Sequence, residues 1–359
     1  RASIFCFALV ALHANAAQEL QSTLDDYRAS QDVPGVSAVV VQHNNVVFAG
    51  GSGVSDIESA TPMTPDTVLY IGSVTKTLTA ILMLQLVEAD QLSLDDPVTS
   101  LGGAAAASVM SLLTHSSGLP REGNFGYWFN GDFPDDDELR EYLLNAPLRE
   151  PAGASAGYSN IGYATLGLLA VQILDQDYSE VLRTRVLEPL QMDASGGRGP
   201  AEKVARGYTP ANRVIPSEER PFTGIGAAVG DRHLREYHDA RAMSPAFGAY
   251  SSANDMGRLL RFLLGYSGNE VLSPGMRAQM YEARSSGWGY GLRIRRIGDR
   301  MIGRHDGWFA AHRTHMIIDV TNGIGVFVMA NSDNATPGKI AEALLDAAHD
   351  ADVTTTSED

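Results

Sequence analysis

Sequence patterns typical of β-strands occur near both ends of the chain, whereas the segment between them has the patterns of helices and loops. Two strand-like runs near the N-terminus, at residues 36–42 and 46–50, are joined by a tight polar turn. Four more runs occupy the last third of the chain, at 289–295, 300–303, 314–320 and 323–329. Because a half-apolar strand must pair and pack to bury its apolar face, we expect both sets of strands to share one sheet.

The expected architecture is therefore an α/β fold: an antiparallel sheet formed by the N- and C-terminal segments and flanked by helices, with an inserted, mostly helical region. We assign residues 17–350 to one domain, with the α/β part at about 17–95 and 246–350 and the helical region at about 96–245. Residues 351–359 are a polar tail. Apolar residues at three-to-four spacing predict the helices. They cover residues 19–28, 73–89, 138–144, 160–174, 178–187, 253–264 and 337–348.

Residues 1–16 are interpreted as a secretory signal peptide of bacterial type, which predicts a secreted or periplasmic protein. Arg1 precedes an apolar run at residues 4–12, and a small-residue cleavage site follows at 14–17. The run is too short to span a bilayer, so we expect no membrane span in the mature protein. A buried N-terminal helix is the alternative. The one cysteine, Cys6, lies in this segment, so the mature chain should contain neither a disulfide nor a cysteine nucleophile.

The charge of the chain bears on its partners. It carries 27 basic and 43 acidic residues, a net charge of −16. An acidic surface repels phosphate backbones and anionic headgroups, so nucleic acids and membrane surfaces are not expected partners. The sequence gives no reason to invoke a metal or an organic cofactor, and it does not indicate the oligomeric state.

Ser73 and Lys76 form the pair of residues that points most directly to chemistry. They are three residues apart at a predicted helix start, so their side chains share a face. Free backbone N–H groups and the helix dipole at this end favour negative charge on the serine oxygen. The same field, together with burial, disfavours a protonated lysine and makes it a usable base. The structural alternative is a serine cap followed by an exposed lysine.

Two further motifs are weaker when taken alone. Tyr158 and Asn160 flank a serine just before a predicted helix, where the phenol can relay protons and the amide can bind a substrate carbonyl. His305, Asp306 and Gly307 lie on or beside a late strand, where glycine permits close approach of a substrate to a strand edge. A capped turn and a surface histidine explain these runs equally well.

In this order the three motifs resemble those of the serine β-lactamase and penicillin-binding-protein superfamily, and most of all its class C β-lactamase, D,D-peptidase and esterase branch. The resemblance covers about residues 20–350 and includes the run Leu-Leu-Thr-His-Ser-Ser-Gly-Leu-Pro at 112–120, which we expect to shape the fold rather than the chemistry. The segment order derived above agrees with the fold of that superfamily.

The resemblance implies a role for each matching residue. Ser73 would be the nucleophile, Lys76 its base partner and Tyr158 a proton carrier, although which of the last two takes the first proton stays open. Asn160 would orient the substrate, and His305 would occupy a position that holds Lys or His in many members. The backbone N–H groups of Ser73 and of Trp308, which follows Gly307, would form an oxyanion hole.

Four other matches were weighed as alternatives. Ser155 lies in a Gly-x-Ser-x-Gly run, but within a loop rich in Pro, Gly and Ala rather than between a strand and a helix. The Ser-Asp-Asn run at 332–334 and the run that begins at Glu141 spell class A β-lactamase motifs in the wrong order. His312 and His315 face opposite sides of a strand-like run, so they do not predict a metal site.

Departures from the family pattern bear on the substrate, which is expected to be a small ester, amide or β-lactam. Where relatives have Thr or Ser, this chain has Asp306, which would repel a substrate carboxylate if it faces the site. That favours neutral acyl esters, amides or substrates bearing an amine over penicillins and D-peptides, although strand alternation allows Asp306 to point away. Aromatic residues at 125–129, with Phe133, can rim an acyl pocket opposite Trp308 and Phe309, or simply pack in the core.

The function expected from the sequence is therefore an esterase-like serine hydrolase that acts through an acyl-enzyme on Ser73. A β-lactamase or D-amino-acid peptidase is the alternative within the same chemistry. A non-catalytic cell-wall-binding protein on the same fold is the alternative of a different class.

Overall fold

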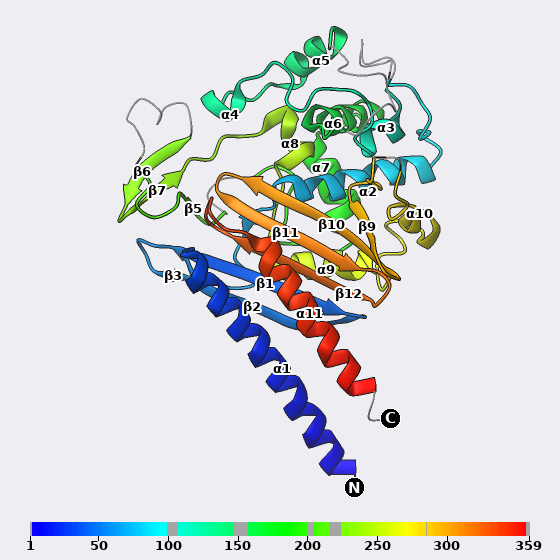
Figure 1. The fold of residues 1–359 in the computed structure, drawn as a ribbon. Coiled ribbons are helices and arrows are strands. Elements are labelled where there is room, and N and C mark those ends of the chain that lie inside the picture. Colours follow the sequence, from blue (N-terminus) through cyan, green and yellow to red (C-terminus); the bar gives the residue numbers. More distant parts are fainter. Residues whose placement is uncertain are drawn as a thin grey trace.

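The computed structural model describes residues 2–98, 107–146, 157–199, 204–214, 224–284 and 286–356. Its central element is a seven-stranded antiparallel sheet with the order β3-β2-β1-β12-β11-β10-β9 (Figure 1). The N-terminal strands are β1 (Gly35–Gln42), β2 (Asn45–Asp56) and β3 (Thr61–Pro62). The C-terminal strands are β9 (Arg293–Ile297), β10 (Arg300–Phe309), β11 (His312–Asp319) and β12 (Ile324–Ala330).

The two ends of the chain meet where β1 pairs with β12, in a register that runs from Val36 opposite Ala330 to Gln42 opposite Ile324. Strand β1 is buried on both faces: Val36, Ala38 and Val40 belong to one apolar cluster, and Val39 and Val41 belong to another. Such a strand lies in the middle of a three-layer structure. The expected α/β fold, with one sheet built from both ends of the chain, is confirmed.

Helices cover both faces of the sheet (Figure 1). Helices α1 (Ala2–Gln31) and α11 (Pro337–Thr356) run beside each other on one face. On the other face lie α2 (Thr75–Glu88) and α9 (Ala253–Leu263), the latter capped by the Ser252 hydroxyl. No helix in the described ranges is long and apolar enough to cross a membrane.

The inserted region packs over α2 and contains mostly short helices. They are α3 (Val109–Leu113), α4 (Tyr127–Asn130), α5 (Asp136–Leu144), α6 (Asn160–Leu174), α7 (Tyr178–Leu182), the π-helix η3 (Arg183–Leu187), the 3₁₀ helix η6 (Arg241–Met243) and α8 (Ser244–Phe247). Helix α10 (Pro274–Gln279) follows later in the chain, outside the insert. Strands β4 (Leu69–Tyr70) and β8 (Tyr250–Ser251) pair across its base.

Two features of the fold differ from the sequence expectation. The insert contains a small sheet of β5 (Gly207–Tyr208), β7 (Arg232–Arg235) and β6 (Ile225–Val229), whose strands are short and only partly buried and so lack a clear apolar alternation. The strand expected at 289–295 begins only at Arg293. The preceding residues form a turn in which Gly291 adopts a φ of +72° and its carbonyl accepts a hydrogen bond from Thr77 at 2.8 Å.

Helix α1 extends well beyond the expected residues 19–28, and α11 continues into the expected tail. The signal peptide, the domain limits and the cellular location stay predictions.

Candidate active site

Ser73 lies in a short 3₁₀ helix, η1 (Gly72–Val74), which leads directly into α2. Gly72 makes this turn possible because its φ is +54°, and a Cβ atom there would lie 2.3 Å from the backbone nitrogen of Trp308. The turn is fixed on the sheet side by the Thr314 hydroxyl, which donates to the Ile71 carbonyl at 2.9 Å. The nucleophile candidate is thus held between α2 and strand β10.

Lys76 is fully buried, and its amine contacts three oxygens. The Nζ atom lies 3.2 Å from Ser73 Oγ, 2.7 Å from Asn160 Oδ1 and 2.6 Å from the Ala246 carbonyl. Burial lowers the pKa of Lys76 well below its usual value, and the charge of Glu122 opposes that shift. Lys76 is therefore a buried amine in direct contact with the candidate nucleophile, not the exposed lysine of the structural alternative.

Tyr158 and Asn160 come from the N-terminal end of α6, where the Ser159 hydroxyl caps the helix by accepting from Gly162 N–H at 2.9 Å. The phenol of Tyr158 is hydrogen-bonded to Ser73, and its ring centroid lies 4.8 Å from the Lys76 amine. Burial raises the pKa of Tyr158 above its usual value, and the bond to Ser73 only partly offsets this. Ser73, Lys76, Tyr158 and Asn160 are thus brought together as expected.

The run at 112–120 holds this second motif in place. His115 accepts a hydrogen bond from Ser159 N–H through Nδ1 at 3.1 Å, and its carbonyl accepts from Gly157 N–H at 2.9 Å. The Pro120 carbonyl accepts from the Ser159 hydroxyl at 2.8 Å. The run therefore positions Tyr158 and Asn160 through the backbone around them, in agreement with the expected structural role.

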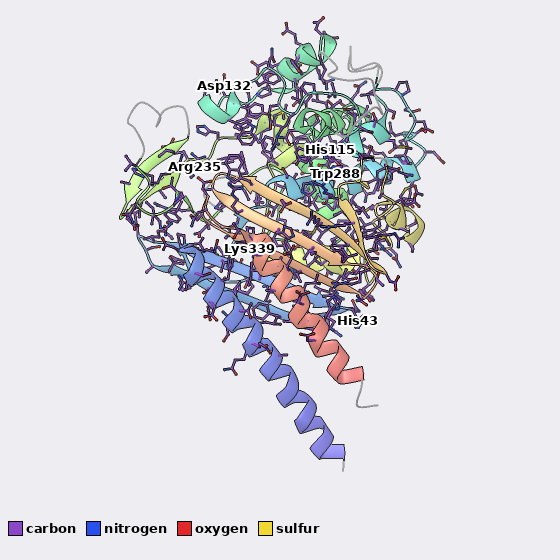
Figure 2. All side chains as sticks on the ribbon, in the orientation of Figure 1. His43, His115, Asp132, Arg235, Trp288 and Lys339 are labelled. Carbon is purple, nitrogen blue, oxygen red and sulfur yellow. The ribbon has the colours of Figure 1, made fainter. Side chains whose placement is uncertain are left out.

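Two residues that the sequence reasoning missed complete this side of the site. Both oxygens of Glu122 lie 2.9 Å from Asn160 Nδ2. The Trp288 ring centroid lies 4.7 Å from that of His115 and 5.6 Å from that of Tyr158 (Figure 2 labels His115 and Trp288). The signal for Glu122 was its place two residues after Pro120, at the end of a run already singled out; Trp288 has no comparable signal.

His305 lies on the face of β10 that is turned toward Tyr158, with 6.3 Å between the ring centroids. Burial, followed by the nearby Lys76, lowers the pKa of His305 to about 4. Its Nδ1 atom lies 2.8 Å from the Asp306 carbonyl, so Nδ1 carries the proton and Nε2 is the acceptor. At neutral pH His305 is therefore an uncharged imidazole.

Asp306 points to the opposite face of β10 from His305. Its carboxylate accepts from His315 Nδ1 at 2.7 Å, in a pair of directly opposed residues on β10 and β11. The His315 ring lies against Gly338 of α11, which marks this face as the α11 side of the sheet. The hydrogen bond from His315 lowers the pKa of Asp306. The idea that Asp306 faces the substrate and repels a carboxylate is therefore wrong, and strand alternation is the reason.

Gly307 and Trp308 form the edge of β10 beside Ser73. A Cβ atom on Gly307 would lie 2.0 Å from the Ile71 carbonyl, so only glycine fits here. The Trp308 indole donates to Asp333 at 2.9 Å and stacks on Trp128, with ring centroids 5.4 Å apart. The Ser-Asp-Asn run at 332–334 thus anchors Trp308 and does not reach Ser73 through its own side chains.

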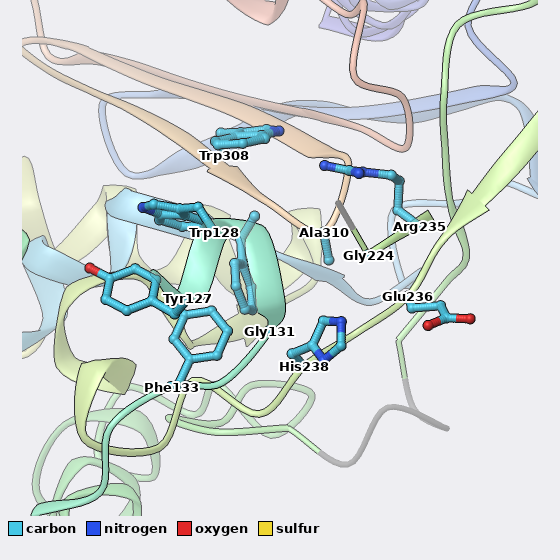
Figure 3. A pocket seen from close by; sticks show the side chains of 11 residues that line it. Tyr127, Trp128, Gly131, Phe133, Gly224, Arg235, Glu236, His238, Trp308 and Ala310 are labelled. Atoms are coloured by element: carbon cyan, nitrogen blue, oxygen red, sulfur yellow. The ribbon is translucent and has the colours of Figure 1, made fainter. Parts of the chain in front are cut away.

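Beside Trp308 lies a small, solvent-open recess with a cavity volume of about 50 Å³ (Figure 3). Its aromatic walls come from the cluster anticipated as an acyl-pocket rim, and its other wall comes from the β7 segment. The lining side chains are those of Tyr127, Trp128, Phe133, Trp308 and Phe309, with Arg235, Glu236 and His238. Phe125 instead packs against Tyr127 and Tyr142.

The remaining alternatives do not join the site. Ser155 lies outside the described residues. Glu141 borders a different recess, on the other side of the loop that follows Pro120. His312 accepts from Tyr70 N–H at 3.2 Å, whereas His315 pairs with Asp306, so these two histidines serve opposite faces of β11. Within the described ranges no three His, Cys, Asp or Glu side chains are grouped as metal ligands.

Comparisons with known proteins agree with this fold. The chain is 27% identical to the esterase EstB of Burkholderia gladioli, over 94% of this chain and 96% of that protein. The D-amino acid amidase of Ochrobactrum anthropi SV3, complexed with D-phenylalanine, superposes with a TM-score of 0.79 at 24% identity, over 96% of this chain and 99% of that one.

The octameric penicillin-binding protein homologue of Pyrococcus abyssi superposes with a TM-score of 0.76 at 26% identity, over 90% of this chain and 75% of that one. The family model described as Beta-lactamase matches residues 20–351. That match covers nearly the whole described sheet, the helical insert and the three motifs. The chain therefore belongs to the β-lactamase family, whose members are serine hydrolases.

Proposed function

We propose that this protein hydrolyses carboxylic esters of small acyl groups through an acyl-enzyme formed on Ser73. The observation that carries the proposal is the contact of 3.2 Å between Ser73 Oγ and the buried Lys76 amine. The esterase EstB, similar over almost the whole chain, supports ester substrates.

The surroundings of Lys76 support a role as the first base. A neutral amine has two N–H bonds and one lone pair. The Asn160 and Ala246 oxygens, at 2.7 and 2.6 Å, take the two N–H bonds, so the lone pair is left for the Ser73 proton. Burial lowers the pKa of Lys76 and so favours this neutral form.

Tyr158 is the proposed proton carrier rather than the first base. Burial raises the pKa of its phenol, which therefore keeps its proton at neutral pH. The phenol contacts Ser73 and lies over the Lys76 amine, so it can pass a proton to the leaving alkoxide. Lys76 then returns its proton to the phenol. Water attacks the acyl group as Lys76 takes the water proton, and the bond between the acyl carbon and Ser73 Oγ breaks as Ser73 is reprotonated.

The developing oxyanion would be bound by the N–H groups of Ser73 and Trp308. The packing of the Trp308 nitrogen against Gly72 supports this, since it brings two backbone donors to one side of Ser73. Two such donors, fixed before the reaction begins, stabilise the charge without reorganisation.

The surroundings of the site favour uncharged, apolar acyl groups. His305 is neutral and so supplies no positive charge for a substrate carboxylate, and one wall of the recess beside Trp308 is aromatic. The β-lactamase and D-peptidase alternatives need a carboxylate to be bound. A purely cell-wall-binding role gives no reason for the close contacts among Ser73, Lys76 and Tyr158.

The test compares the protein and its Ser73→Ala variant on a short-chain p-nitrophenyl ester and on a chromogenic cephalosporin. We expect ester turnover that the variant lacks, with little cephalosporin cleavage. Rapid cephalosporin cleavage would make the protein a β-lactamase instead. Ester turnover that survives in the variant would remove Ser73 as the nucleophile, and no turnover of either compound would favour a peptide substrate or a binding role.

A further inference from the structure

A continuous chain of polar contacts leads from the candidate nucleophile to a carboxylate that the proposed chemistry does not use. Ser73 Oγ lies 3.2 Å from Lys76 Nζ, and Lys76 Nζ lies 2.7 Å from Asn160 Oδ1. Asn160 Nδ2 in turn lies 2.9 Å from both oxygens of Glu122. The Asn160 side chain is buried, whereas the Glu122 side chain is 22% exposed.

The two ends of this chain fix the orientation of the Asn160 amide. A carboxylate can only accept, so Glu122 requires the NH₂ group of the amide. The oxygen of the amide must then face Lys76. If the amide turned by half a rotation, its NH₂ group would donate to the lone pair of a neutral Lys76 and compete with Ser73 for it.

Glu122 is itself held firmly. Tyr127 donates its hydroxyl to one carboxylate oxygen, and Arg121 Nε donates to the other at 2.9 Å. The Arg121 carbonyl accepts from Asn160 N–H at 2.8 Å, which ties the loop to the start of α6. Because the Glu122 carboxylate is held in place, it can hold the Asn160 side-chain amide in one of its two possible orientations.

We infer that Glu122 is a positioning residue, which acts on Lys76 by locking the Asn160 amide with its oxygen toward the lysine. The inference rests on the proposed function, since it assumes that Lys76 activates Ser73. It assigns Glu122 no contact with the substrate.

The charge of Glu122 gives the inference a second readout. The groups that act on or contact Lys76 are Glu122 and Arg121 from one loop, His115 from the run before it, Tyr158 and Tyr163 from the α6 segment, and His305 from β10. Glu122 raises the pKa of Lys76 against the effect of burial. Removing its charge should therefore move the acidic limb of the kcat/KM profile to lower pH, which a loss of folded protein would not do.

The first experiment is a double-mutant cycle with Glu122→Gln and Asn160→Ala. It measures the rate at which a fluorophosphonate labels Ser73, by intact mass, together with kcat and KM on a p-nitrophenyl ester. In the wild-type background we expect Glu122→Gln to slow labelling by about tenfold or more with KM nearly unchanged, and in the Asn160→Ala background by less than about threefold. Glu141→Gln, which borders the neighbouring recess without contacting Asn160, is the matched control.

An equal loss in both backgrounds, or a loss confined to KM, would overturn the inference and point to direct substrate contact. A rescue experiment covers the case in which Glu122→Gln folds poorly. Glu122→Asp keeps an acceptor-only carboxylate on the same loop and should regain most of the labelling rate that Glu122→Gln loses. No regain would contradict the inference.

A measurement without any reaction separates this inference from the proposed function. In protein labelled with ¹⁵N-asparagine, the Asn160 side-chain NH₂ protons should exchange with solvent more slowly than in Glu122→Gln. Equal exchange in both proteins overturns the positioning role, whatever the activity. If the fluorophosphonate does not label Ser73 in the wild-type protein, the proposed function is wrong. The exchange result then tests the positioning role of Glu122 by itself.

Discussion

The two faces of strand β10 place their titratable side chains in opposite environments. On the face toward the inserted helices, His305 is buried, uncharged and beside Tyr158. On the face toward α11, Asp306 binds His315 across the strands, and the Asp306 side chain is 79% exposed. Adjacent residues thus take up a candidate catalytic role and a cross-strand pair, and only the alternation of side chains along the strand separates them.

His305, Asp306 and Gly307 are consecutive in the sequence, but they lie in two different environments in the folded protein. His305 and Gly307 belong to the site, whereas Asp306 lies on the α11 side of the sheet, where its largely exposed side chain pairs with His315. Substitutions on the first face should therefore change activity, and those on the second should change mainly stability.

The largest expected effect is that of Lys76→Ala. This change removes the base that touches Ser73 and leaves the Asn160 oxygen without its donor. We expect kcat/KM for a p-nitrophenyl ester to fall by about 10³-fold or more. Lys339→Ala, on α11, is the control and should keep wild-type turnover. Turnover within tenfold of wild type in Lys76→Ala would remove the lysine from the mechanism.

Gly307→Ala tests the edge of β10 that lies beside Ser73, next to Asp306 in the chain. The new methyl group would meet the Ile71 carbonyl at 2.0 Å, so β10 must move away from Ser73. We expect kcat to fall by about 10²-fold, as for the loss of an oxyanion donor, with a lower melting temperature. Gly275→Ala, in α10 with open space around it, is the control and should change neither. A fully active Gly307→Ala protein would contradict the proposed place of Trp308.

Trp128→Ala tests the recess on the site face. Loss of the indole that stacks on Trp308 should weaken the binding of aromatic acyl groups more than that of acetyl. We expect kcat/KM for p-nitrophenyl phenylacetate to fall by about tenfold more than for p-nitrophenyl acetate. Equal losses on both esters would indicate a structural role only.

The smallest expected effects come from Asp306. Because it faces α11, Asp306→Thr should not raise the rate of acylation by a cephalosporin, and a gain of tenfold would show that the carboxylate does face the site. Its folded pKa is lowered by His315, so the pair stabilises the protein above the carboxyl's unfolded pKa, and this contribution is lost as the pH falls through the folded value. Asp306→Asn should therefore lower the free energy of unfolding at pH 7 by less than about 1 kcal/mol, and this loss should shrink as the pH falls through the folded pKa of the carboxyl.

The sequence predicted the features that depend on local spacing. Ser73 and Lys76 meet because they are one helical turn apart, and the common sheet follows from strand patterns at both ends of the chain. Features that depend on distant packing were missed. Glu122 and Asn160 are 38 residues apart in the chain, and nothing in either local pattern indicates their contact.

The orientation of Asp306 could not be fixed for a related reason. Alternation says that neighbours point to opposite faces, but not which neighbour faces the site. That depends on the register of β10 with β11, which sets Asp306 opposite His315 and leaves Gly307 against Ile71.

The central claim is that Ser73 carries a covalent acyl group. Rapid quenching of the protein with a p-nitrophenyl ester, followed by intact and peptide mass spectrometry, measures this directly. We expect a mass gain equal to one acyl group, located on the peptide that contains Ser73 and absent from Ser73→Ala. An acyl group on another residue, or turnover that persists in Ser73→Ala, would contradict it.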